Sequence, residues 1–405
     1  MISKKNIIDY FMILVLIFIS GNISFTSKSI LFTTFILSTL LFIYRKQKFD
    51  KKFTLFSLLL FVILLLQSVK FDFFPIETYL GVFIRILIAY FILRSIGNSF
   101  IDKFIKVMYY LSIISLGFYF SILLIPNLEQ VYVNNFTTYA IIDPHNLSRY
   151  SVFGIYTIIP EADDLIKSNS GPFWEMGAFG GYLVLALIFN LLNDDNLKNK
   201  VNLVLIITII TTQSTTAFIA LFMLLFFIYY QKFKSIASKI IITLFILVSS
   251  YYAYTSLDFL GKKIEHQLKM ASVVNTSNLQ NADTQRFINI LKDWNDFQGH
   301  EFIGRGPNSI TRYSSTNKNE IRTVGTTDMI VRYGLAFFLL IIYLMYRSIE
   351  SYSRSIDKGD KIKSIGIVIV ILTLLMSETY FLYSLFWILI FLQYVYNIDK
   401  EEIDV

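Results

Sequence analysis

The chain contains long runs of apolar residues without a charged side chain, and these runs limit the folds that it can adopt. Residues 53–69 and 107–125 are two examples. Apolar residues make up 55% of the chain and charged residues only 16%, and the mean hydropathy is +0.58. Runs of this length without period-two alternation predict membrane-spanning helices, because a helix in lipid satisfies its own backbone hydrogen bonds. We therefore expect an all-α, polytopic membrane helical bundle.

The apolar runs and the breaks between them predict about twelve spans in one integral membrane domain that covers residues 1–405. Residues 201–230 are interpreted as two short helices joined by a polar turn, since basic clusters on both flanks require the same side of the membrane. The expected spans lie near 7–20, 29–44, 53–69, 76–96, 104–125, 172–192, 201–212, 215–230, 238–256, 327–346, 363–377 and 380–397.

The net charge of +7 is spread over the ends of the expected helices, which argues against a nucleic-acid partner. Basic clusters fall in alternate loops, so both termini are expected in the cytoplasm. Two long loops, 126–171 and 257–326, are then extracytoplasmic. The chain has no cysteine, and its three histidines lack the spacing of metal ligands, so we assign no metal or thiol site.

The second long loop contains the pattern of an amphipathic helix over residues 284–298. Asp283 or Thr284 can cap its start. Its apolar stripe consists of Phe287, Ile288, Ile290, Leu291, Trp294 and Phe297. Such a helix is expected to lie on the membrane surface or over the mouth of a cavity.

Arg85 lies in the middle of the fourth expected span. A charge at that depth is costly and normally faces a partner or a wet cavity. A structural ion pair with another span and a functional site are both open at this point.

Glu175 lies at the start of the sixth expected span. A carboxylate there can simply stabilise the helix through the helix dipole, or it can act as a general base. Arginines and glycines of the two long loops are candidates for binding an anion, because arginine binds phosphate oxygens bidentately and glycine permits close backbone approach. They are Arg149, Arg286, Gly304, Arg305 and Gly306, and Asp328 and Arg332 follow just beyond the second loop.

Several of these segments occur in an order that resembles the Wzy-type polymerases of O-antigen and capsule repeat units. Gly171-Pro-Phe-Trp-Glu-Met-Gly-Ala-Phe179 is similar to that family's Gly-x-Phe-x-Glu-Pro-(Ser/Gly)-x-Phe segment, with Met176 in place of Pro. The polar turn 211–217, Arg286 ahead of Gly304 and Gly306, and Thr327-Asp328 before Tyr333-Gly334 follow in the family's order. The resemblance covers most of residues 80–345.

The resemblance implies a GT-C-like glycosyltransferase in the bacterial cytoplasmic membrane that needs no cofactor. Its donor is a glycan on undecaprenyl diphosphate, and its acceptor is a lipid-linked repeat unit. A flippase and a chain-length regulator would be its partners. Under this hypothesis Glu175 is the base, Asp328 orients an acceptor hydroxyl or an arginine, and the arginines hold the diphosphate. These arginines are Arg149, Arg286 and Arg305, with Arg85 or Arg332.

Two alternatives are kept. A lipid-linked glycan ligase uses the same chemistry, but the related ligases usually carry a histidine just before the span at 327–346, where this chain has none. A flippase or other transporter should show halves related by a repeat and polar residues at the midplane, and the sequence shows neither. A non-enzymatic scaffold leaves Arg85 unexplained.

Overall fold

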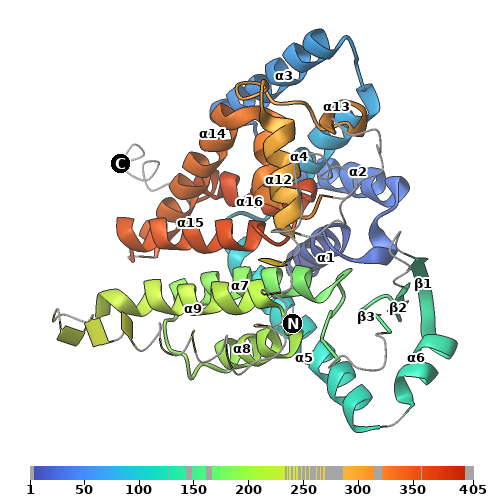
Figure 1. The fold of residues 1–405 in the computed structure, drawn as a ribbon, viewed down its shortest axis with the longest axis vertical. Helices are drawn as coiled ribbons and strands as arrows, with labels where there is room; N and C mark the ends of the chain where they lie inside the picture. Colours follow the sequence, from blue (N-terminus) through green and yellow to red (C-terminus); the bar gives the residue numbers. More distant parts are fainter. Residues whose placement is uncertain are drawn as a thin grey trace.

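The computed structural model describes residues 4–125, 127–142, 148–160, 167–232, 286–313, 322–356 and 358–396, with scattered positions between 235 and 269. The described chain is mostly helical, and its first five helices lie close to the expected spans. They are α1 (Lys4–Ile19), α2 (Lys28–Tyr44), α3 (Lys51–Phe71), α4 (Ile76–Ile96) and α5 (Phe100–Leu124). α2 packs against α4, and α1 packs against α5 (Figure 1).

The first long loop contains a small β-sheet, which the prediction of an all-α bundle did not include, so the described chain is mostly but not entirely helical. Helix α6 (Leu128–Phe136) is followed by three antiparallel strands, β1 (Thr137–Ile142), β2 (Ser148–Val152) and β3 (Tyr156–Ile158). Together they form one flank of the molecule (Figure 1). Val152 of β2 and Tyr156 and Ile158 of β3 pack against Phe118 of α5 and against α6, so these two short strands bury an apolar surface.

Helix α7 (Met176–Asn193) is buried on all sides and packs against α5, α8 (Lys200–Thr212) and α9 (Thr215–Tyr229). The predicted break between the last two helices is confirmed: Gln213 has a left-handed conformation, and the Ser214 hydroxyl caps α9. Small residues on α7 permit close packing. A Cβ atom on Gly180 would lie 2.7 Å from Ala217 Cβ, and one on Gly181 would overlap the Tyr380 ring.

The C-terminal part begins with α12 (Arg286–Phe297) and α13 (Ser309–Arg312). Three further helices follow: α14 (Gly325–Ser355), α15 (Lys361–Leu375) and α16 (Ser384–Phe391). α14 is broken at Gly334, which has φ +81° and ψ +162°. α16 is shorter than the expected span because 3-10 turns at Tyr380–Leu382 and Leu392–Tyr394 flank it. Only scattered positions of the expected span 238–256 are described, and the capping residues Asp283 and Thr284 lie outside the described residues.

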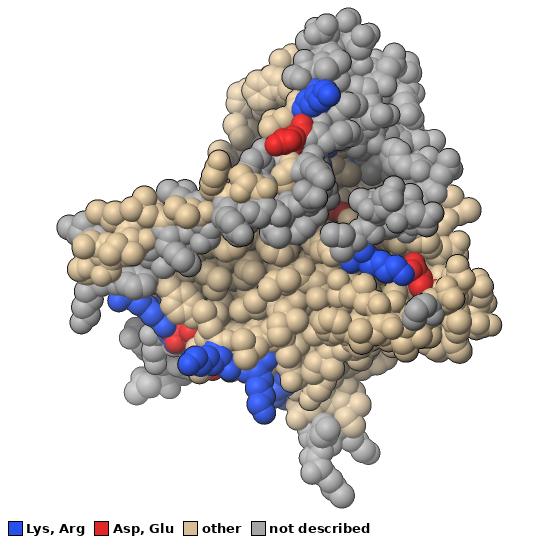
Figure 2. All heavy atoms as spheres, turned by 60° about the horizontal axis from the view of Figure 1, so that its bottom comes forward, with Lys and Arg blue, Asp and Glu red and all other residues tan. Residues whose placement is uncertain are grey.

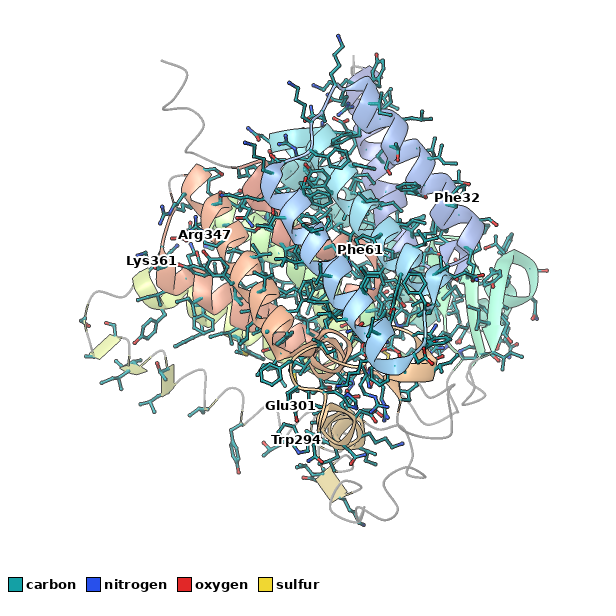
Figure 3. All side chains as sticks on the ribbon, turned by 90° about the horizontal axis from the view of Figure 1, so that it is seen from above. Phe32, Phe61, Trp294, Glu301, Arg347 and Lys361 are labelled. Atoms are coloured by element: carbon teal, nitrogen blue, oxygen red, sulfur yellow. The ribbon has the colours of Figure 1, made fainter. Side chains whose placement is uncertain are left out.

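Within the described ranges, four helical segments are long and apolar enough to cross a membrane: α3, the stretch from α4 to the end of α5, α7 and α14. Figure 2 shows a broad uncharged face with charged side chains at its margins. These are features of a helical membrane protein. We call the end of the bundle with α6, the sheet, α12 and α13 the loop end. Trp294 and Glu301 lie at this end, and Arg347 and Lys361 lie toward the other (Figure 3).

Candidate functional site

Glu175 stands directly before α7, at the loop end, in a segment that is held firmly. Asn169 donates hydrogen bonds to the hydroxyls of Ser115 and Thr211, at 3.3 and 3.0 Å. The backbone N–H of Trp174 donates to Gly21 O at 2.9 Å. Glu175 itself is the N-cap of α7, but its carboxylate caps no helix N–H. Helix capping therefore does not explain why a glutamate occupies position 175.

A second carboxyl group, Glu378, meets Glu175 above the first turn of α7. It lies between α15 and α16, and its side chain is 8% exposed. A Cβ atom on Gly177 would lie 3.0 Å from Glu175 Oε1, 3.1 Å from Glu378 Oε1 and 3.7 Å from Arg286 Nη2. The absence of a side chain at Gly177 thus leaves room where the two carboxyl groups and one guanidinium converge.

The electrostatics favour a protonated Glu378. Burial, and next the neighbouring Glu175 carboxylate, raise the pKa of Glu378 well above its ordinary value, and the two carboxyl groups are hydrogen-bonded. Arg286 Nη2 lies 3.6 Å from Glu378 Oε1, and Arg149 Nη2 lies 3.9 Å from Glu175 Oε2. Two guanidinium groups therefore face the two carboxyl groups, of which Glu378 has the raised pKa.

Aromatic rings form the wall beside this pair. Trp174 stacks on Tyr383 with ring centroids 4.9 Å apart, and the Trp174 indole hydrogen-bonds to Glu378. The Tyr380 hydroxyl donates to Gly177 O at 3.0 Å. Tyr383 follows Glu378 by five residues, so this ring stack lies on the same short segment as the carboxyl group.

Arg85 lies in a groove of about 830 Å³ on the side of the bundle. Its Nη1 donates to Gly81 O at 2.9 Å, and among the described residues no carboxylate forms an ion pair with it. A structural ion pair with another described span therefore does not explain Arg85. The groove is mostly apolar, and its wall includes Phe32, Leu80, Ile84, Pro307, Arg332, Phe381 and Trp387.

Asp328 and Arg332 belong to a buried ionic network beneath α12. Arg312, which is fully buried, contacts Asp293 at 2.6 Å, Asp328 at 3.0 Å and Asp296 at 3.2 Å. Arg332 Nε contacts Asp328 Oδ2 at 2.5 Å. Of the two roles predicted for Asp328, orienting an arginine is therefore the one that this geometry supplies.

A turn built on two glycines packs against the break in α14. Gly304 and Gly306 have φ values of +69° and +90°, which favour glycine. A Cβ atom on Gly304 would lie only 2.6 Å from Arg332 O. Arg305 donates to Thr311 O at 2.8 Å. The two glycines thus allow the turn to approach the α14 backbone.

Sequence reasoning identified Glu175, Arg149 and Arg286, which the structure brings together, but it missed Glu378. A signal was present, because Glu378 is the only charged residue between Lys363 and Asp399. It also missed Arg312 as the centre of the ionic network. Within the described parts of the chain, no group of three or more possible ligands is arranged to hold a metal ion.

Comparisons with protein-family models, with curated proteins and with solved structures gave no match.

Proposed function

We propose that this protein is a glycosyltransferase that polymerises glycans carried on undecaprenyl diphosphate. The proposal includes about twelve membrane spans, both termini in the cytoplasm and the loop end on the outer side of a bacterial cytoplasmic membrane. The observation that carries it is the position of the carboxyl pair. Glu175 and Glu378 lie between two arginines and next to an apolar groove that contains a third arginine, Arg85.

The groove suits a lipid-linked anion. Its apolar wall can hold a polyprenyl chain, and Arg85 can bind a phosphate oxygen of the diphosphate. Phe381 and Leu382 of the groove wall follow Glu378 by three and four residues, so the groove adjoins the segment that carries this carboxyl group. A donor whose lipid occupies the groove would therefore place its anomeric carbon toward the carboxyl pair.

The reaction then needs one base and positive charge for the leaving group. An acceptor sugar hydroxyl attacks the anomeric carbon and gives its proton to Glu175, while the bond from that carbon to the diphosphate oxygen breaks. The lipid diphosphate leaves with the electron pair, and Arg149, Arg286 and Arg85 stabilise its charge. Protonated Glu378 holds the Glu175 carboxylate by a hydrogen bond.

Reconstitution into vesicles with synthetic undecaprenyl-diphosphate repeat units tests this function. We expect chain extension without a nucleotide sugar, and a loss of about 100-fold or more in Glu175→Gln, the usual effect of losing a general base. Arg286→Ala should also slow extension. Glu350→Gln and Arg354→Ala, which remove an ion pair of α14 outside the site, are matched controls.

Full activity of Glu175→Gln and Arg286→Ala would contradict the site. A wild-type protein that moves the lipid-linked unit across the bilayer without extending it would instead be a flippase. Transfer of the glycan only to a different acceptor would identify a ligase.

A further inference from the structure

Helix α12 is amphipathic, but it turns its polar side inward. Asn289, Lys292, Asp293 and Asp296 are buried. On the opposite side Trp294 is 61% exposed and Leu291 is 41% exposed. An amphipathic helix on a water-facing protein surface normally buries its apolar stripe against the core, so this orientation is the reverse of the usual one.

The buried ionic network fixes α12 in this orientation. Its two aspartates are bound by Arg312 and Arg322, and Asp293 also accepts a hydrogen bond from the Thr327 hydroxyl at 2.5 Å. Rotation of α12 to bury its apolar side would carry Asp293 and Asp296 to the surface. Arg312, which is not on α12, would then stay buried without these two partners. The exposed apolar side is therefore a built feature of the fold.

This apolar side continues into the apolar surface of the long helices. Lys70, at the end of α3, donates to Gly299 O at 3.1 Å, just beyond α12. Phe302, which is 83% exposed, follows, and the Leu335 N–H of α14 donates to Glu301 O at 2.8 Å. In Figure 3, α12, marked by Trp294, is seen end-on near one end of α3, which is marked by Phe61 and is seen lengthwise. The axis of α12 therefore lies across the axis of α3.

We infer that the exposed apolar side of α12, formed by Leu291 and Trp294 together with Phe302, lies in the lipid leaflet at the loop end. The occupant of this surface is lipid, because the surface joins the exposed apolar faces of α3 and α14 and runs in the plane of the membrane. Arg286, the first residue of α12, is thereby held at the depth of lipid phosphates beside Glu378.

Cysteine labelling tests the inference directly, because the chain has no cysteine of its own. We compare Trp294→Cys with Glu301→Cys, an exposed site near the same end of the bundle (Figure 3), in vesicles with a membrane-impermeant maleimide. The Trp294→Cys variant should react about tenfold or more slowly, as expected for a group about 5–10 Å below the headgroup boundary. Equal rates would overturn the inference.

Emission quenching distinguishes lipid from a protein cover. In a Trp174→Phe, Trp387→Phe variant Trp294 is the remaining tryptophan, and phosphatidylcholine with bromine near the glycerol end should quench it strongly. Slow labelling without quenching by brominated lipid would mean that another protein covers α12, and it would overturn the inference. Neither measurement needs a glycan substrate, so the result is independent of the proposed polymerase activity.

Discussion

Replacing Arg312 by methionine should release α12 from the bundle. The wild-type guanidinium is fully buried among Asp293, Asp296 and Asp328, and it contacts each of them at 2.6 to 3.2 Å. Methionine fills much of the volume but leaves three buried carboxylates with two arginines. Removing one partner of a buried ion pair costs about 3–5 kcal/mol. That range corresponds to roughly a 100- to 4,000-fold increase in local opening.

Hydrogen exchange of the α12 amides measures this opening. Arg312→Met should exchange faster by the factor given above. Arg354→Ala removes an i,i+4 ion pair of α14 whose arginine is 54% exposed, and because this pair lies outside the network its α12 amides should stay near the wild-type rate. Adding Asp293→Asn to Arg312→Met restores charge balance and should recover part of the protection.

The effect should also depend on pH. Burial already raises the pKa of Asp293, and loss of Arg312 would raise it further. A carboxyl group with a raised pKa stabilises the fold when protonated, and this stabilisation is lost as the pH rises. The ratio of variant to wild-type exchange should therefore be greater at about pH 8 than at about pH 5. Exchange within threefold of wild type at high pH would refute the reasoning.

The remaining predictions concern the site. Because the pKa of Glu378 is raised, the polymerisation that we propose should fall as rising pH removes the proton of Glu378. Glu378→Gln cannot ionise and should lack this alkaline decline, so identical pH profiles would contradict a role for protonated Glu378. Gly177→Ala should abolish most activity without unfolding the protein, because the new methyl group would lie 3.0 Å from Glu175 Oε1. Gly117→Ala on α5, where no atom lies within 4 Å of the new methyl group, should leave the activity unchanged. Arg85→Ala should raise the donor concentration needed for half-maximal rate about tenfold, which is the effect of losing one charged hydrogen bond, and should leave thermal stability unchanged. An unaltered donor requirement would show that Arg85 does not bind the donor.

The helices could be predicted where charged residues flank an apolar run. Residues 53–69 were expected and α3 spans Lys51–Phe71, because the cost of burying charge in lipid marks both ends. The strands β1 to β3 were not predicted. They are three to six residues long, and their stability depends on contacts with Phe118 and Tyr132, which local pattern does not reveal.

The candidate site was predicted only in part, for a similar reason. Motif order pointed to Glu175 and Arg286, but the partner of both, Glu378, follows them by 203 and 92 residues and sits in a short gap between apolar runs. The amphipathic pattern of α12 was also visible in the sequence. Which side faces inward depends on Arg312 and Arg322, which lie outside the helix, so the orientation could not be predicted locally.

The distance along the chain between Glu175 and Glu378 has a consequence for biosynthesis. A membrane protein is synthesised and inserted from its N-terminus, so α7 is in place well before α15 and α16. Until that last helical pair is integrated, Glu175 has no acid partner and Arg286 has no anchor. A nascent chain therefore holds an incomplete candidate site until α15 and α16 have reached the bilayer.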